Sequence, residues 1–249
     1  MPGPGPLDPT SIPLAPMAER LSRGAALCAV DSAAVLAMPH SVRDYQAGQY
    51  LLREGDRPRY CSFMLSGYTY RHKFVGDGGR QIVSIHIEGD FIDLQNMLLD
   101  LADHNIQALT RTTVVQIEAS LVTEHAFAHP LLGRAFWRES LVEASIFREW
   151  VANIGRRDAH SRTAHLLCEL ATRREAAGLG PRDLFELPMT QEQLGDALGL
   201  TAVHVNRTLK MLQEDGLITR SKRSVSVADW DRLRDAADFT SDYLHLHLQ

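Results

Sequence analysis

The residues whose types and spacing could do chemistry are concentrated in one stretch, LTAVHVNRTLKMLQEDGLI, at residues 200–218. Thr201 is a residue type that caps the start of a helix, and Gly216 is one that ends a helix. Between them, Val205, Leu209 and Leu212 follow one another at steps of four and three residues. That spacing places all three on one helix face, so the stretch predicts a short amphipathic helix.

The opposite face of this predicted helix carries side chains suited to hydrogen bonding. Asn206 offers an amide, Arg207 a fork of donors and Lys210 an ammonium group, with Val203 beside them. Such donors can read guanine edges and hold phosphate oxygens. Each charge taken alone is most simply a solvated helix face, so the interpretation depends on the elements around the helix.

A second short helix is predicted directly before the first. Thr190 and Gln193 form a T-x-x-Q capping box that opens the segment QEQLGDAL, and Gly199 can take the left-handed conformation that closes it. Leu194 and Leu198 supply the apolar side that faces the later helix. Two short helices joined by a glycine turn constitute a helix-turn-helix.

The segment LITRSKRSVSV after the second helix alternates as strand, turn and strand. Arg220, Lys222 and Arg223 lie at its tip. A basic hairpin beside a recognition helix is a wing that can contact the phosphate backbone. The cap, the glycine turn, the apolar spacing and the wing together favour DNA binding over a solvated surface.

Composition limits how that contact is made. The chain has 249 residues, 45% of them apolar, with a net charge of −5. A nucleic-acid contact must therefore be local, because the molecule as a whole is not a polycation. No run approaches the ~18 apolar residues of a membrane span, so no membrane partner is expected.

The termini and the cysteines suggest a cytoplasmic protein. Residues 1–20 begin MPGPGPLDPTSIPLAP, which predicts a disordered arm and lacks the features of a signal peptide. Cys28, Cys61 and Cys168 are far apart, which argues against a disulfide framework or a zinc ribbon and favours a reducing compartment. Each cysteine is expected to be a buried apolar residue.

The tail YLHLHLQ, with His245 and His247, is expected to be a terminal strand or a packed tail.

The segments before the helix-turn-helix change from a strand-like to a helix-like residue pattern along the chain. Residues 40–118 contain short alternating runs such as YTYRHKF and QIVSIHI between glycines, which predicts a β-sandwich or barrel with a hairpin at VGDGGRQI. The segment SLVTEHAFAHP predicts a short helix ended by Pro130. Asp158 is predicted to cap a new helix, so we place a domain boundary at Arg157–Asp158.

A long helix is predicted over residues 131–157, and it is too apolar for a small sheet domain to cover. Its apolar positions recur at steps of roughly three and four residues. They are Leu132, Phe136, Leu141, Phe147, Val151 and Ile154, with Trp137 and Trp150 in addition. Such a helix commonly pairs with its own copy, so we expect a homodimer. Packing wholly within the monomer is the alternative.

The stretch TQEQLGDALGLTAVHVNRTLKMLQEDGLITRSKRSVSV resembles the winged helix-turn-helix of the Crp/Fnr superfamily of bacterial transcription regulators. The preceding REGDRP, LSG and IEGDFI, followed by the long helix, resemble the family's cyclic-nucleotide-binding-type sensor. The resemblance implies an α+β protein with a β-roll at residues 21–130, a dimerisation helix at 131–157 and a winged helix-turn-helix at 158–249. It implies a regulator rather than an enzyme, with pseudo-palindromic double-stranded DNA and RNA polymerase as partners.

The resemblance also assigns roles in the DNA-binding motif. Arg207 matches the arginine that reads guanine, and Thr190 and Thr201 match positions that cap helices and contact phosphate. Val203 departs from the pattern, because the best-known members carry there a glutamate that accepts from cytosine. An isopropyl group could instead touch a thymine methyl. His204 and Asn206 could supply alternative readout.

The sensor segment departs from cyclic AMP binders of the family. Asp93 lies near the place of their ribose-binding glutamate, and His104 and Asn105 lie near the place of their phosphate-binding arginine and serine. Without a fixed cation a buried phosphate loses its charge partner, so cyclic AMP is not the expected effector. Arg111 is the one candidate substitute, which keeps a cyclic-nucleotide-dependent regulator as the alternative.

No cofactor, metal site or catalytic residue is predicted. Three cysteines cannot supply the four thiolates of an iron–sulfur cluster. His125 and His129 share a helical face but lack a third ligand. A cupin-like metalloenzyme would need more than His86 and Glu88, and a protein-interaction module is a third class that a test of DNA binding would separate.

Overall fold

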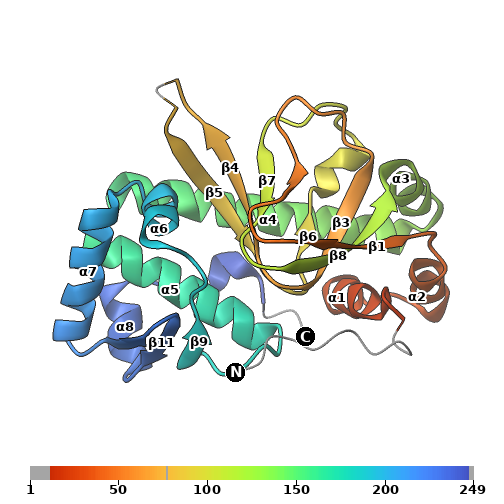
Figure 1. Ribbon diagram of the computed structural model, residues 1–249. Coiled ribbons are helices and arrows are strands. Elements are labelled where there is room, and N and C mark those ends of the chain that lie inside the picture. The colour runs from red at the N-terminus through yellow and green to blue at the C-terminus, as the bar shows by residue number, and fades with distance from the viewer. Residues whose placement is uncertain (1–11, 77, 247–249) are drawn as a thin grey trace. The chain divides into compact units, whose positions relative to one another are not determined.

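The structure is a computed structural model that describes residues 12–76 and 78–246 (Figure 1). Its described residues form two compact units, the first containing residues 12–70 and 85–141 and the second residues 71–84 and 142–246. The chain crosses between the units after Tyr70, after Ser84 and after Leu141, the last of these inside one continuous helix. The boundary predicted at Arg157–Asp158 lies at the junction between two helices.

The strands of the roll form two antiparallel sheets. One sheet has the order β1 (Ser41–Tyr45), β8 (Thr112–Glu118), β3 (Tyr60–Ser66) and β6 (Phe91–Ile92). The other has the order β2 (Tyr50–Leu52), β7 (Asn105–Ala108), β4 (Thr69–Phe74) and β5 (Arg80–His86). β4 and β5 are neighbours, as the predicted VGDGGRQI hairpin requires. This organisation confirms the predicted cyclic-nucleotide-binding-type roll.

The core of the first unit forms where strand residues meet helix residues. In the β3–β8 pair, Cys61 is opposite Ile117 and Phe63 is opposite Val115. Directly opposed residues point to the same side of a sheet, and all four are buried in one cluster. Helices α3 (Ala119–Ala128) and α4 (Pro130–Arg156) add further members to that cluster. These are Val122, Leu132, Ala135 and Phe136.

Residues 15–25 form helix α1 (Ala15–Ala25). The prediction of a disordered arm over residues 1–20 is therefore wrong for residues 12–20. Leu14, Met17 and Leu21 are buried in the core of the first unit. Their spacing of three and four residues is helical, but the surrounding prolines obscure it. Pro16 lies in the first turn, where proline is tolerated because the N–H there has no helical partner. Residues 1–11 are outside the described residues. Helix α2 (Ala29–Leu36) follows.

The apolar positions of α4 do not form one face. Leu132 and Phe136 are fully buried in the first unit, and Trp150 is buried in the second. Trp137, Leu141 and Val151 are 68%, 67% and 73% exposed. The helix therefore carries one apolar set that packs within the monomer and another that faces solvent. Of the helices described, none is both long and apolar enough to cross a membrane.

The second unit is built on α5 (Ala159–Ala176). Asp158 caps this helix by accepting a hydrogen bond from the Ser161 backbone N–H at 2.9 Å, as predicted. The C-terminal helix α8 (Trp230–Ala236) and the 3₁₀ turn η2 (Asp242–Leu244) follow the wing. Leu233, Phe239 and Leu244 are buried, so the chain up to residue 246 forms a packed tail. His247 lies outside the described residues.

A buried carboxylate holds the tail to the helices. Glu169 is 1% exposed and accepts hydrogen bonds from Trp150 Nε1 at 3.0 Å, Tyr243 Oη at 2.9 Å and Arg173 at 3.2 Å. Burial raises the pKa of the Glu169 carboxyl, and Arg173 opposes that rise. The three donors compensate the carboxylate for the water it has lost.

We expect Tyr243→Phe to lower the free energy of unfolding by about 1–3 kcal/mol, because it leaves one lone pair of a buried carboxylate without its donor. Urea unfolding followed by circular dichroism measures the change. Tyr60→Phe is the control, since that side chain is 39% exposed, and it should change the free energy by less than about 0.5 kcal/mol. Equal effects in the two variants would show that Tyr243 does not stabilise the tail.

Candidate nucleic-acid interface

Helix α6 (Gln191–Leu198) begins at the predicted capping box. Thr190 Oγ1 accepts from the Gln193 backbone N–H at 3.2 Å, and Gln193 Oε1 accepts from the Thr190 backbone N–H at 2.9 Å. Two backbone donors that the helix cannot satisfy are thereby paired. The Thr190 hydroxyl keeps its own proton, which can be donated to a phosphate.

The turn between the two helices depends on two glycines. Gly199 has φ +64°, the left-handed conformation expected from the sequence. Gly195 lies within α6, and a Cβ on it would be 2.4 Å from the carbonyl oxygen of Leu200. A side chain there would push the turn away from the helix. Sequence reasoning missed Gly195, because a glycine inside a helix has meaning only when the neighbouring backbone is known.

Helix α7 (Ala202–Glu214) is the predicted recognition helix (Figure 1). Thr201 caps it by accepting from the His204 backbone N–H at 3.2 Å. Val205, Leu209 and Leu212 are fully buried, which confirms the predicted inner face. The core contact fixes the rotation of α7 about its axis and so decides which side chains point outward.

The predicted readout residues share the outer face of α7. Val203 is 81% exposed, and His204, Asn206, Arg207 and Lys210 are also exposed. The Arg207 side chain forms no hydrogen bond or ion pair with any residue the structure describes. Lys210 Nζ lies 3.4 Å from a Glu214 carboxylate oxygen, but both groups are largely exposed. Such a pair is weak, so the ammonium group can exchange this partner for a phosphate.

Gln191 is a residue of this surface that sequence reasoning missed. Its amide Nε2 donates to Asn206 Oδ1 at 3.2 Å. The contact joins the start of α6 to α7 and leaves the Asn206 amide N–H groups available as donors. Nothing in the sequence signals the pair, because the two residues are 15 positions apart.

The wing is the hairpin of β10 (Ile218–Ser221) and β11 (Ser224–Val227), with β9 (Leu184–Glu186) paired to the far side of β11. Ser221 is opposite Ser224, so Lys222 and Arg223 form the turn and are exposed. Lys222 has φ +55°. Arg220 is half-buried, and burial lowers the pKa of its guanidinium, which stays charged at neutral pH. Two exposed cations at the tip can contact phosphates.

Arg162 supports the helix-turn-helix from α5, and sequence reasoning missed it. Its guanidinium donates to the carbonyl oxygens of Leu198 at 2.6 Å, Ile154 at 2.7 Å and Arg157 at 3.0 Å. One cation thus satisfies the last carbonyls of α6 and of α4. An arginine on a helix gives no sequence signal for such a role.

The roll contains a pocket of about 300 Å³. Of the four predicted effector residues, only Asp93 lines it. Asn105 is buried and accepts from the Glu54 backbone N–H at 3.2 Å, while the Arg111 side chain is 73% exposed and lies 3.9 Å from Asp44. The structure thus brings Asp93 and His104 together, whereas Asn105 and Arg111 are bound to other neighbours, so the four residues do not line one pocket.

A histidine–carboxylate pair occupies the region expected to hold the phosphate. His104 Nε2 lies 3.0 Å from Asp93 Oδ1, and His104 Nδ1 lies 2.7 Å from Asp103 Oδ1. Both Asp93 and His104 are buried. Asp93 has φ +58° and also accepts from Gln95 Nε2 at 3.0 Å. The carboxylates would repel a phosphate placed beside them.

His125 and His129 lie together at the end of α3, and two of the three cysteines are buried. The rings of His125 and His129 are stacked with centroids 6.2 Å apart, and Nδ1 of His129 lies 3.4 Å from Asp31. Within residues 12–76 and 78–246, no group of three or more His, Cys, Asp or Glu side chains could hold a metal ion. Cys28 is exposed, contrary to expectation, whereas burial raises the pKa of the Cys61 and Cys168 thiols to about 12.

Similarity to known proteins agrees with this architecture. Residues 42–126 match the family described as "Cyclic nucleotide-binding domain", and residues 161–236 match "Crp-like helix-turn-helix domain". Transcriptional activator protein FnrL of Cereibacter sphaeroides is 31% identical over 222 residues, 87% of this chain and 88% of that protein. Nitrogen fixation regulation protein FixK of Azorhizobium caulinodans is 30% identical over 172 residues, 69% of this chain and 68% of that protein.

Among solved structures, FixK2 from Bradyrhizobium japonicum matches 82% of this chain and 100% of that chain with a TM-score of 0.75 and 24% identity. A cyclic-nucleotide-binding-type roll followed by a helix-turn-helix defines a class of DNA-binding transcription regulators rather than of enzymes. The chain belongs to the Crp/Fnr family of that class.

Proposed function

We propose that the protein acts as a homodimer, reads a pseudo-palindromic operator through α7 and contacts RNA polymerase at the promoter. The proposal that the protein reads DNA depends on the side chains exposed on the outer face of α7. There Arg207 has no partner among the described residues and lies with Asn206 and Lys210 on one exposed face, while the wing supplies the exposed cations Lys222 and Arg223. Two such faces related by a twofold axis fit two half-sites about one helical turn apart.

The exposed stripe of α4 supports the dimer. Its members follow one another at alternating steps of three and four residues. They are Arg134, Trp137, Leu141, Ala144, Arg148 and Val151. This is the heptad spacing of a coiled-coil seam, with Trp137, Leu141 and Val151 about two-thirds exposed or more in the monomer. We name this set the α4 stripe and assign it to the dimer interface.

Binding to duplex DNA at two salt concentrations tests the proposal against a protein-interaction module. A regulator that neutralises phosphates with Lys222, Arg223 and Lys210 should lose affinity steeply as salt rises. We expect retention on DNA–agarose at low salt and elution at a higher concentration. Retention that does not change with salt, or no retention, would contradict DNA binding through these cations.

We expect cyclic AMP not to be the effector. A buried cyclic phosphate needs a cation and several donors, but the positions matched to the family's phosphate-binding arginine and serine are His104 and Asn105, and His104 is paired with the carboxylates of Asp93 and Asp103. Lacking one charged hydrogen-bond partner costs a few kcal/mol, or roughly a hundredfold in affinity. Calorimetry with cyclic AMP and cyclic GMP, with a DNA shift assay beside it, should show no micromolar binding. Micromolar binding that raises DNA affinity would make the protein a cyclic-nucleotide-dependent regulator.

A further inference from the structure

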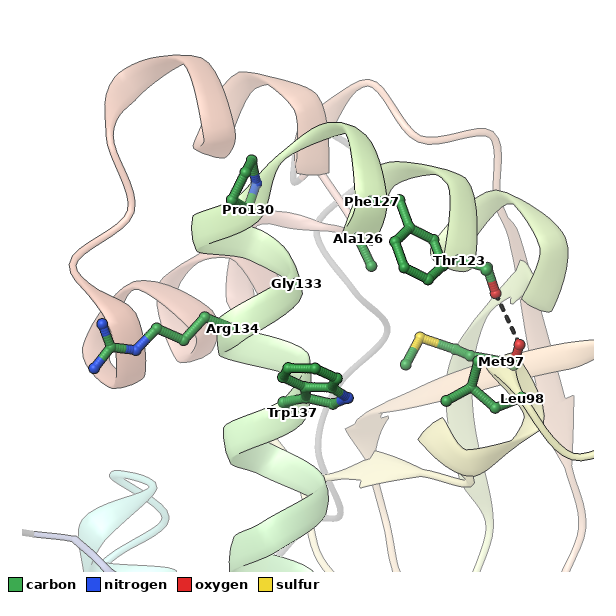
Figure 2. A pocket seen from close by; sticks show the side chains of 9 residues that line it. All are labelled: Met97, Leu98, Thr123, Ala126, Phe127, Pro130, Gly133, Arg134 and Trp137. Atoms are coloured by element: carbon green, nitrogen blue, oxygen red, sulfur yellow. Dashed lines mark hydrogen bonds between the residues drawn. The ribbon is translucent and has the colours of Figure 1, made fainter.

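The first unit has an apolar pocket of about 440 Å³ outside the roll (Figure 2). It lies between the 3₁₀ turn η1 (Leu94–Met97), helix α3 and the start of α4. Figure 2 shows Phe127 and Ala126 from α3, Met97 and Leu98 from the end of η1, and Trp137 from α4 around one hollow.

Apolar side chains make up most of the lining of this hollow, and its polar side-chain groups among the described residues are the Thr123 hydroxyl, the Arg134 guanidinium and the Trp137 indole N–H. The Thr123 hydroxyl is within hydrogen-bonding distance of two carbonyl oxygens, Met97 O at 3.0 Å and Ala119 O at 2.8 Å. Arg134 borders the pocket, but its side chain points away from the hollow (Figure 2). The pocket therefore suits an apolar or aromatic group, because a polar one would leave its hydrogen bonds unmade.

The apolar side chains at the mouth are largely exposed in the monomer. Phe127 is 79% exposed, Trp137 68% and Leu98 63%. A contiguous apolar patch of this kind on a protein surface marks an interaction site. The patch is continuous with the α4 stripe, because Trp137 belongs to both. The surface that covers the stripe thus extends over the pocket.

The stripe also limits where Trp137 can go in a dimer. A twofold axis that runs along the α4 stripe makes the two α4 helices parallel, so identical residues are at the same level. Paired helices lie about 8–10 Å apart, and Ala144 in the stripe favours the short end of that range. Two indoles facing each other at one level would overfill that seam. Each must therefore turn aside from the seam.

We propose that, in the dimer, the pocket of each copy receives Trp137 of the partner subunit. The pocket lies directly beside each copy's own Trp137, which is the level at which a parallel partner presents its indole. Phe127 and Met97 then contact an aromatic ring, a favourable pairing for both a phenyl group and a thioether. This inference rests on the proposed dimer and adds to it a second, reciprocal contact.

Mixing two variants tests the exchange. Trp137→Ala removes the inserted side chain, and Ala126→Phe fills the pocket, since the Ala126 methyl group points into the hollow (Figure 2). Each homodimer lacks both insertions and should dissociate about thirtyfold more readily than the wild type, as for a buried tryptophan anchor. The mixed dimer keeps one complete insertion, because the filled copy supplies a tryptophan to the open pocket of the other.

Native mass spectrometry of the mixture should therefore show heterodimers above the statistical proportion, with a lower dissociation constant than either homodimer. A statistical mixture would overturn the proposal. Leu98→Trp, at an exposed loop position, fills the same pocket and replaces Ala126→Phe if that variant unfolds. A small apolar molecule bound to the wild-type dimer at this pocket would also contradict the proposal. If the wild type is monomeric, the proposed dimer itself fails, which is a different result.

Discussion

Replacing Leu141 with glutamate is expected to convert the dimer into monomers. Leu141 lies in the middle of the α4 stripe and is 67% exposed, so the change costs little within the monomer. In a twofold interface it places two carboxylates opposite each other in an apolar seam. We expect the dissociation constant to rise by at least a hundredfold, or roughly 3 kcal/mol. Sedimentation velocity over a concentration series measures it.

The matched control is Val30→Glu, another exposed apolar residue on a helix, 67% exposed on α2 and outside the stripe. It should remain dimeric. Phe147→Glu is a poorer choice than the sequence suggests, because Phe147 is half-buried and the Arg71 guanidinium lies 5.3 Å from its ring centroid. A Leu141→Glu protein that sediments as a dimer would exclude the α4 stripe as the interface.

Arg207→Ala is expected to have the largest effect on sequence reading. A bidentate arginine contact to guanine contributes about 1–3 kcal/mol to discrimination, so the variant should lose that preference at one base pair in each half-site. Because the dimer presents Arg207 twice, the loss on a full operator should be about double the half-site value. Titration of the wild type and the variant against operators substituted one base pair at a time measures both quantities.

Lys222→Ala is the control for a contact to phosphate only. Lys222 is in the turn of the wing, so its removal should weaken all DNA sequences similarly and reduce the dependence of affinity on salt. An Arg207→Ala variant that weakens every operator equally would show that Arg207 holds phosphate rather than reads a base.

The local features of the DNA-binding motif could be predicted from the sequence. Thr190 and Thr201 cap helices, Gly199 closes the turn, and Val205, Leu209 and Leu212 face the core, as their spacing requires. Each of these depends on residues within a few positions of one another. Local hydrogen bonds and helical periodicity are set by the chain itself, which is why the sequence was sufficient.

The features that were missed depend on distant parts of the chain. Arg162 binds carbonyl groups at the ends of two other helices, and Asp93 pairs with His104 eleven residues away. The sequence alone does not separate the two apolar sets of α4. Only the structure shows that Leu132 and Phe136 are buried in the core, whereas Trp137 and Leu141 are exposed. Helix α1 was missed because proline-rich composition hid three apolar residues whose partners lie in the roll and on α4.

Selection of binding sites from random duplex DNA tests the central claim most directly. The full chain is incubated with random duplexes, and the bound sequences are amplified and read. We expect a pseudo-palindrome with half-sites about 10–10.5 bp apart, centre to centre, and a guanine in each half-site that Arg207→Ala no longer selects. Recovery of sequences without a shared motif would contradict the claim that α7 reads DNA.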